Sequence, residues 1–303
     1  MGRAKNLRRK FTKAFPAWHV IEYLFVRAAF AFINLFPIRI STSISRRMGD
    51  IAFLILPKRK KIALQNITIA FGSSKTTKEK SKIARESFRN LTTCIMEFFR
   101  FPKAKKTLEG HYKIRGVEHI DGAVAKKKGV IIAMAHLGPW EYVGFPCYLR
   151  KYKGATLGRP VKNPYLYRWI KSLREMMTLE YIDKDAGPKK IFSKLKENYV
   201  VGIAIDQWAG NDGMWVDFFG KPTSTTSIPA EFAKRTGCAI VPICCLRVAP
   251  GEYEMHAEPE VYVNGDDKDY AMNTTKELNR RLERKIRSFP EQWLWSHKRW
   301  KKI

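Results

Sequence analysis

Two side chains with acid–base chemistry stand close together in residues 129–144, which read GVIIAMAHLGPWEYVG. His136 and Glu141 form the pattern H-x-x-x-x-E. A carboxylate near an imidazole could orient the ring and stabilise its cationic form, leaving the other ring nitrogen to take a proton from a hydroxyl nucleophile. The pair is therefore a candidate for acid–base catalysis, and the alternative is that His136 is a polar residue of a turn.

The same stretch has the form of a buried strand that ends at a turn. Apolar residues 130–134 run through Ala135 into the turn 136–139, which contains Gly-Pro. A short apolar run bounded by Gly and Gly-Pro is typical of a buried strand, so His136 is expected where a strand meets a loop. Ligands bind beyond the strand ends in an open α/β sheet, which makes this turn a candidate site.

Three other polar residues follow predicted strands. Asp206 and Gln207 come directly after the apolar run 200–205. Both could touch a substrate, although Asp206 could instead cap a turn. Arg159 follows a short strand predicted at 155–157, and its fixed guanidinium could bind a phosphate or steady an oxyanion. The alternative for Arg159 is a structural ion pair.

The elements that position these residues alternate between strand and helix after Gly110. The strands are expected at 112–117, 130–135, 155–157, 199–205 and 240–246, with an extended turn at 214–219 and an edge strand at 254–258. The helices are expected at 165–177, 188–197, 227–236 and 270–287. Strands separated by helices predict an α/β fold, a largely parallel sheet covered on both faces.

The N-terminal region differs from the rest of the chain. A basic arm, residues 1–14, precedes the apolar segment 20–36, which is interrupted by Glu22, Arg27 and Asn34. As a helix this segment would be about 26 Å long, slightly short of the roughly 30 Å hydrocarbon core. It could lie in the membrane interface, span the bilayer with its charges snorkelling, or be an ordinary buried helix. A cleaved signal peptide is disfavoured because no small-x-small site follows, and the basic arm favours a cytoplasmic N-terminus.

The division into regions follows from these patterns. Residues 1–40 are predicted to form the basic arm and a membrane-associating helix. Residues 41–303 are predicted to form the main domain, with a helical subregion at 41–109 and a sheet-containing core at 110–303. Thr76 to Glu79 offer a helix start within the helical subregion.

The charge balance points to acidic partners. The 303 residues include 57 basic and 28 acidic side chains, a net charge of +29, which suits nucleic acid, an anionic membrane or an acidic carrier protein. Clusters of basic residues lie at 1–14, 58–61, 100–106, 126–128 and 298–302. Beside the apolar segment they favour a membrane surface, and no nucleic-acid-binding motif is legible.

Cysteine and histidine patterns suggest neither disulfides nor a metal. The five cysteines form no C-x-x-C pair, and an odd number cannot all pair with one another, which favours a reduced, cytosol-facing protein. The six histidines lack ligand spacing, so no metal site is predicted. Near the C-terminus, Trp293, Trp295 and Trp300 are expected to pack against the core, or else to anchor at a membrane interface.

Several segments in order resemble the hallmarks of one family. Residues 158–164 (GRPVKNP) resemble an R-P-x-x-N-P block. Asp206-Gln207 and residues 218–225 (FFGKPTST) resemble a D-Q and F-F-G-x-x-x-x-T block. Residues 290–295 (PEQWLW) resemble a P-E-Q-W ending. With the H-x-x-x-x-E pattern, the ordered set resembles the bacterial lipid A biosynthesis acyltransferases from about Trp18 to the C-terminus.

That resemblance implies both a fold and a reaction. The fold would be an αβα sandwich like that of glycerophospholipid acyltransferases. The reaction would move a fatty acyl chain from an acyl carrier protein thioester to a hydroxyl of a lipid A precursor, late in lipopolysaccharide biosynthesis. His136 would be the general base and Glu141 its orienting partner, with Arg159, Asp206 and Gln207 binding substrate. The acyl thioester would be a co-substrate, and no cofactor is expected.

The expected partners are an acyl donor, a glycolipid acceptor and an anionic membrane, at the cytoplasmic face of the bacterial inner membrane. One alternative is an acyl-coenzyme A-dependent enzyme acting on another glycolipid, such as a phosphatidylinositol mannoside. A second alternative is a basic membrane-binding protein without enzymatic activity.

Three positions depart from the family pattern. Pro139 stands where Asn is frequent, and Gly158 stands where an aromatic residue commonly precedes the Arg-Pro. Arg174 is followed by Glu175 where an Arg-Gly is usual. The His/Glu pair itself is retained.

Overall fold

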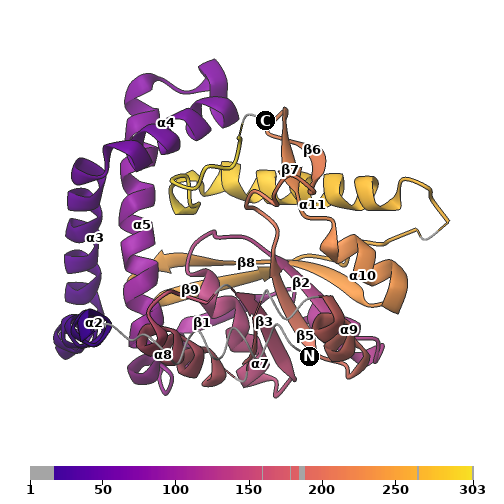
Figure 1. Ribbon diagram of the computed structural model, residues 1–303, viewed down its shortest axis with the longest axis horizontal. Helices are drawn as coiled ribbons and strands as arrows, with labels where there is room; N and C mark the ends of the chain where they lie inside the picture. The colour runs from indigo at the N-terminus through magenta and orange to yellow at the C-terminus, as the bar shows by residue number, and fades with distance from the viewer. Residues whose placement is uncertain (1–16, 159, 178, 184–187, 265, 302–303) are drawn as a thin grey trace.

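The computed structural model describes residues 17–158, 160–177, 179–183, 188–264 and 266–301 (Figure 1). Arg159 and the predicted basic arm, residues 1–14, lie outside these described residues.

A seven-stranded sheet forms the centre of the molecule, in the order β1-β9-β8-β2-β5-β3-β4. Its strands are β1 (Tyr112–Arg115), β2 (Val130–Met134), β3 (Gly154–Gly158), β4 (Leu179–Asp183), β5 (Val200–Ala204), β8 (Ala239–Ala249) and β9 (Glu252–Ala257). The five strands from β4 to β8 pair in parallel, whereas β9 is antiparallel to β8 and β1 runs parallel to β9. The predicted, mostly parallel sheet is confirmed.

Two strand predictions need correction. The segment predicted as an edge strand at 254–258 is β9, which lies inside the sheet because β1 pairs with its outer side. The true second edge is β4, which the sequence did not reveal, since its charged residues Glu180 and Asp183 follow directly on an apolar helical stripe. The predicted extended turn at 214–219 is β6 (Met214–Phe218), which forms a hairpin with β7 (Lys221–Thr225).

Helices cover both faces of the sheet, as predicted. Ile131 and Ala133 of β2 share one apolar core with α9 (Pro188–Lys196), α10 (Ile228–Thr236) and α11 (Tyr270–Ser288). Val130 and Ile132 of the same strand share the other core with α6 (Val117–Ala125), α7 (Phe145–Leu149) and α8 (Pro164–Glu175). Figure 1 shows α11 above the sheet and α7 and α8 below it, so the fold is an αβα sandwich.

The N-terminal region is helical, as predicted. It contains α2 (Ala17–Leu35), α3 (Ile38–Ile55), α4 (Pro57–Phe71) and α5 (Thr77–Ala104). The side chain of Thr76 accepts a hydrogen bond from the backbone N–H of Glu79, whose carboxylate caps Thr76 in return, so α5 starts at a capping box. Phe88 of α5 belongs to one core and Phe98 to the other. In Figure 1, α5 stands across the carboxyl end of β8.

The C-terminal tryptophans are part of the core. Trp293 and Trp295 are fully buried, and their rings meet edge to face with centroids 4.6 Å apart. Trp300 stacks on Phe218 of β6 at 5.8 Å. The expected packing against the core is therefore what these side chains do.

Candidate active site

Adjacent strands bring His136 and Asp206 together. In the parallel pair of β2 and β5, Met134 lies beside Ala204. His136 comes two residues after Met134, and Asp206 comes two residues after Ala204. Asp206 Oδ1 lies 2.9 Å from His136 Nδ1, and Asp206 Oδ2 accepts a hydrogen bond from the backbone N–H of His136 at 2.9 Å. The site therefore lies at the carboxyl edge of the sheet, where the sequence predicted it.

Asp206 is a buried, ionised carboxylate. Trp293 donates a third hydrogen bond to it, from Nε1 to Oδ2 at 2.9 Å. Burial alone would raise the pKa of Asp206, but the charge of His136 and these hydrogen bonds outweigh burial and lower the pKa to about 2. Because the carboxylate is ionised at neutral pH, it fixes the proton of His136 on Nδ1.

His136 presents its other nitrogen, Nε2, toward the site. Burial lowers the pKa of the imidazole, but the charge and hydrogen bond of Asp206, and then the charge of Glu141, reverse the balance and raise it above its usual value. The amide nitrogen of Gln207 lies 3.3 Å from Nε2, and the ring of Trp140 lies 5.3 Å from the imidazole. The deprotonated Nε2 can accept a proton from a hydroxyl that takes the place of Gln207.

The orienting contact predicted for Glu141 is wrong in this structure. Glu141 accepts a bidentate pair of bonds from Arg174, Nε to Oε2 at 2.9 Å and Nη2 to Oε1 at 2.6 Å. The 3₁₀ turn η3 (Trp140–Gly144) begins directly after Pro139 and directs the carboxylate toward the last turn of α8. Asp206 makes the direct contact with His136, and Glu141 acts on the imidazole through its charge. A need for Glu141 in the reaction stays a prediction.

The turn that carries His136 is held by the C-terminal segment around the 3₁₀ turn η5 (Pro290–Gln292). The backbone N–H of Gly138 donates to the carbonyl of Gln292 at 2.9 Å, and that of Leu294 donates to the carbonyl of His136 at 3.1 Å. Gly138 has φ of +60°, and a Cβ there would lie 2.1 Å from the carbonyl oxygen of Cys245. The backbone of the turn is therefore fixed by its neighbours.

Pro139 suits the shape of this turn. Its φ of −76° and ψ of 67° are those of the central residue of an inverse γ-turn, which the hydrogen bond from Trp140 N–H to the Gly138 carbonyl closes at 2.9 Å. The proline ring favours this φ and lacks the N–H that the turn does not use. The departure from the family pattern at this position is therefore compatible with a well-defined turn.

Gly158, the second departure, also has a physical reason. A Cβ at this position would lie 2.6 Å from the hydroxyl oxygen of Tyr181. The guanidinium of Arg174 lies 5.2 Å from the centre of the Tyr181 ring. Tyr181 on the neighbouring strand β4 thus fills the space that a side chain at position 158 would need.

A buried ion pair supports the turn from behind. Arg247 Nε donates to Glu97 Oε1 at 2.6 Å, and the hydroxyl of Tyr253 donates to the same oxygen at 3.0 Å. The backbone N–H of Arg247 donates to Gln292 Oε1 at 3.0 Å, and Gln292 Nε2 donates to the carbonyl of Arg247 at 3.1 Å. Sequence reasoning missed Glu97 and Arg247, because their contacts join segments far apart in the chain.

Arg299 fixes the segment that contains Asp206 and Gln207. It is fully buried, and its guanidinium donates to the carbonyl of Gln207 at 3.2 Å, to the carbonyl of Ser224 at 2.5 Å and to Thr225 Oγ1 at 2.6 Å. Burial lowers the pKa of Arg299 to about 10, although the negative charge of Asp206 acts to raise it. The guanidinium therefore stays charged at neutral pH.

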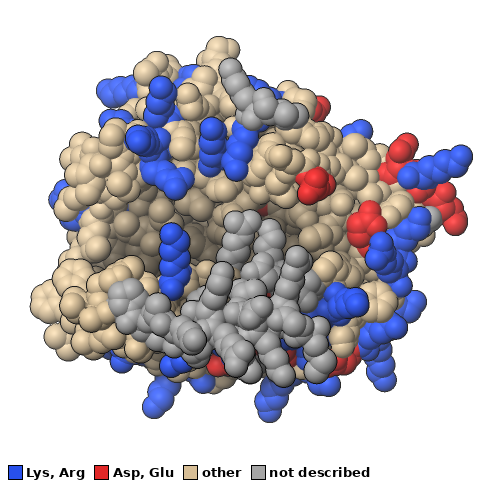
Figure 2. Space-filling view, viewed as in Figure 1, with Lys and Arg blue, Asp and Glu red and all other residues tan. Residues whose placement is uncertain are grey.

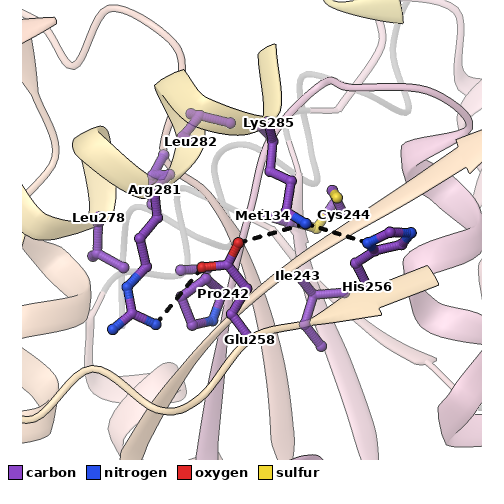
Figure 3. A pocket seen from close by; sticks show the side chains of 13 residues that line it. Met134, Pro242, Ile243, Cys244, His256, Glu258, Leu278, Arg281, Leu282 and Lys285 are labelled. Atoms are coloured by element: carbon purple, nitrogen blue, oxygen red, sulfur yellow. Dashed lines mark hydrogen bonds and ion pairs between the residues drawn. The ribbon is translucent and has the colours of Figure 1, made fainter. Parts of the chain in front are cut away.

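A pocket on the α11 side of the same strand ends carries paired charges. Lys285 Nζ lies 3.7 Å from Glu258 Oε1 and 3.2 Å from His256 Nδ1. Arg281 Nη1 lies 3.7 Å from Glu258 Oε2. Figure 3 marks these three contacts with dashed lines. Both cations share the one carboxylate of Glu258, which ties α11 to the end of β9. A second pocket lies on the opposite face of the sheet, beside Trp140 and Glu141, with mostly apolar walls.

The sequence profile described as bacterial lipid A biosynthesis acyltransferase matches residues 8–302. The chain, an αβα sandwich with a histidine–aspartate pair at its carboxyl edge, therefore belongs to that family.

Named relatives fall into two groups. A phosphatidylinositol mannoside acyltransferase of Mycobacterium tuberculosis (strain ATCC 25618 / H37Rv) is 27% identical over 191 residues, 62% of this chain and 59% of that protein. The lipid A biosynthesis palmitoleoyltransferase of Escherichia coli (strain K12) is 26% identical over 263 residues, 84% of this chain and 83% of the relative. The lauroyltransferase of the same strain is 25% identical over 259 residues, with the same coverage.

Proposed function

We propose that this protein is an O-acyltransferase of late lipopolysaccharide biosynthesis. It moves a fatty acyl chain from an acyl carrier protein thioester to a hydroxyl of a lipid A precursor, at the cytoplasmic face of the bacterial inner membrane. The observation that carries the proposal is the imidazole of His136, whose Nδ1 is held by ionised Asp206 and whose Nε2 lies 3.3 Å from the amide nitrogen of Gln207. Membership of the lipid A biosynthesis acyltransferase family supports an acyl donor and a lipid acceptor as the substrates on which this base would act.

The reaction proceeds by direct transfer. His136 Nε2 takes the proton of the acceptor hydroxyl while the hydroxyl oxygen attacks the thioester carbonyl carbon. The carbon–sulfur bond then breaks, and the departing thiolate takes the proton back from His136. Asp206 stabilises the imidazolium that forms between these steps.

A cysteine nucleophile is not part of the proposal. All five cysteines are buried. Burial raises the pKa of Cys147 and of Cys244 to about 12, so their thiols stay protonated at neutral pH. Direct attack by the acceptor hydroxyl needs no covalent enzyme intermediate, and the acyl thioester is a co-substrate.

Substrate binding is assigned to Gln207 and Arg159. When the incoming hydroxyl takes the place of the Gln207 amide at Nε2, that amide can turn and donate a hydrogen bond to the hydroxyl oxygen. Arg159 belongs to the R-P-x-x-N-P block that resembles the family, and we assign it to a substrate phosphate. The charge and planar donors of its guanidinium suit that group.

A groove lined by lysines supports an acidic donor. It lies between α4, the β6–β7 turn and the C-terminal segment, and its lysines are Lys60, Lys61, Lys221, Lys298 and Lys301. Figure 2 shows Lys and Arg side chains gathered over α4 at the top of this face. Lys301 Nζ lies 5.3 Å from the ring of Trp208, close to the Asp206-Gln207 segment, so a bound carrier would stand near the site.

The second candidate is acyl transfer from acyl-coenzyme A to a phosphatidylinositol mannoside. Three relatives of that name, at 24 to 27% identity, favour it. Both candidates use the same general base, and they differ in donor and acceptor.

A donor and acceptor panel tests the proposal. The purified protein is incubated with a carrier-protein or coenzyme A thioester and with a lipid A precursor or a phosphatidylinositol mannoside, and the products are weighed by mass spectrometry. One added acyl chain on the lipid A precursor, with the carrier-protein thioester as the better donor, is expected. Transfer only to the mannoside would establish the second candidate, and transfer to neither would leave the non-enzymatic alternative. His136→Ala is the matched inactive control.

A further inference from the structure

The helix α2 lies against the protein body along its whole length. At its start, the side-chain amide of Asn163 donates to the carbonyl of His19 at 2.8 Å and to Glu22 Oε2 at 2.9 Å. In its middle, the guanidinium of Arg27 lies 4.7 Å from the ring centre of Trp169 on α8. At its end, Lys103 Nζ donates to the carbonyl of Asn34 at 2.6 Å.

These contacts explain the polar residues of the apolar segment. Glu22, Arg27 and Asn34 are the three residues that interrupt it, and all three contact the protein. The opposite side of α2 is apolar and exposed, with Phe25 74% and Leu35 75% exposed. Of the described helices, α2 alone is long and apolar enough to cross a bilayer. Crossing would require it to leave α5 and α8, and would leave the charges of Glu22 and Arg27 in hydrocarbon.

The helix α3 has an inverted pattern of burial. Its small and polar residues Ser41, Ser45 and Gly49 face α5, and a Cβ on Gly49 would lie only 2.5 Å from the backbone of Arg89. Its large apolar residues point outward, with Leu54 72% and Ile55 67% exposed. Small residues between helices and large apolar residues outside are the pattern of helices surrounded by lipid.

Both apolar surfaces are on one side of the molecule. In Figure 1, α2 is seen end-on and α3 runs upright, both at the left edge, with α5 and α8 on their inner side. Two helices that cross in this way define a flat face. Its exposed apolar residues are Trp18, Ile21, Leu24, Phe25, Phe32 and Leu35 of α2, and Ile40, Met48, Ile51, Leu54 and Ile55 of α3.

We propose that α2 and α3 together form a membrane-embedded face that lies in one leaflet of an anionic bilayer, with α2 in the membrane plane and not across it. The charges around the face fit this partner. Arg39 and Arg47 lie on α3, and Lys58 and Arg59 lie in the first turn of α4, the next helix. Each basic side chain near an anionic surface adds attraction to the apolar contact. The inference builds on the proposed membrane location, but its test involves no acyl transfer.

Vesicle binding tests the contribution of α3. The full-length protein is floated with vesicles of phosphatidylglycerol and phosphatidylcholine. Leu54→Glu is expected to lower the bound-to-free ratio about tenfold, since it replaces an apolar contact with lipid by a charge. Tyr262→Glu, at a residue that is 81% exposed outside this face, is the matched control and should bind like the parent. Both positions are exposed, so circular dichroism and thermal melting should show an unchanged fold.

Two outcomes would contradict the role of α3 in membrane binding. Equal vesicle binding by Leu54→Glu and Tyr262→Glu would remove α3 from the membrane contact. A change from dimer to monomer in Leu54→Glu without loss of vesicle binding would make the face a contact between two copies of the chain. Either result leaves the proposed acyl transfer untouched, because no substrate is present.

Side-specific labelling tests the orientation of α2. Ala17→Cys and Arg39→Cys place thiols at exposed positions at the start of α2 and just past its end, whereas the five native cysteines are buried. With protein bound to preformed vesicles, a membrane-impermeant maleimide added outside should label both positions, and the same reagent trapped inside should label neither. Labelling of Ala17→Cys or Arg39→Cys from the inside would show that α2 crosses the bilayer and would overturn the in-plane assignment.

Discussion

At the scale of single residues, two carboxylates act on His136, and they have different partners. Asp206 touches the imidazole directly and has three hydrogen-bond donors, so its charge is fixed beside Nδ1. Glu141 shares its charge with Arg174 and reaches the imidazole only through space. The two carboxylates should therefore affect the acid–base behaviour of His136 to different extents.

The pH dependence of kcat distinguishes the effect of Asp206 on His136 from that of Glu141. As the proposed general base, His136 must be neutral to act, and its pKa is raised above the usual 6.5, so kcat should rise with pH through that raised value. Asp206→Asn removes the charge that raises the pKa and leaves burial, which lowers it, so the acid limb should move to lower pH. The same change should reduce the plateau of kcat by about 10²-fold or more, since the ring loses its orienting partner. Glu141→Gln should move the limb in the same direction by less. A larger shift in Glu141→Gln than in Asp206→Asn would contradict the assignment of the direct partner.

The turn at Gly138 can be tested through stability. Gly138→Ala places a Cβ 2.1 Å from a backbone oxygen at a φ of +60°, whereas Gly220→Ala, at a φ of +68°, meets nothing within 4 Å. The control should lose only the roughly 1 kcal/mol of a left-handed alanine. Gly138→Ala should lose clearly more free energy of unfolding and much of its activity, as measured by thermal denaturation and initial rates. Similar losses in both variants would mean that the turn can move away from Cys245.

At the scale of elements, periodicity was sufficient for the strands that matter most. The apolar run predicted as a strand at 130–135 is β2, and the run predicted at 199–205 is β5, so the carboxyl edge followed directly from the sequence. The partner of His136 did not follow, because sequence distance suggested Glu141, five residues away, over Asp206, which lies two residues past the end of the neighbouring strand. The direction of Glu141 depends on η3 and on Arg174, and neither contact has a local pattern in the sequence.

We expect only the end of the acyl chain in the apolar pocket beside η3, because its cavity volume of about 40 Å³ has room for no more than a few methylene groups. The pocket is lined by Val143, Thr156 and Leu179, and also by Gly202 of β5. A Cβ at Gly202 would meet its nearest neighbour, Met134 Sδ, at an ordinary 3.5 Å, so Gly202→Ala should fold and act like the parent. Gly202→Leu should fill the pocket and shift the product toward shorter chains in competition assays with mixed donors. An unchanged chain-length distribution in Gly202→Leu would place the acyl chain elsewhere.

At the scale of the whole molecule, the net charge of +29 is distributed over surfaces with different expected partners. The groove beside α4 faces the donor in our proposal, and the face of α2 and α3 contacts lipid. Charge reversal can therefore address one surface and leave the other intact.

Lys60→Glu/Lys61→Glu should raise KM for the carrier-protein thioester several-fold and leave KM for a coenzyme A thioester nearly unchanged, because only the protein donor needs an extended acidic contact. Lys268→Glu/Lys276→Glu makes the same change in charge at exposed positions outside the groove and serves as the control. The difference should shrink as salt is raised and screening shortens the range of the charges. Equal effects of the two double variants would show that net charge matters and the groove does not.

The contacts of the C-terminal segment also impose an order on synthesis. Residues 38–55 of α3 leave the ribosome long before Trp293, which holds Asp206, and Leu294, which holds the carbonyl of His136. Chains fold as they emerge, N-terminal parts first. A nascent chain can therefore expose its proposed membrane face while His136 and Asp206 still lack the contacts of the C-terminal segment.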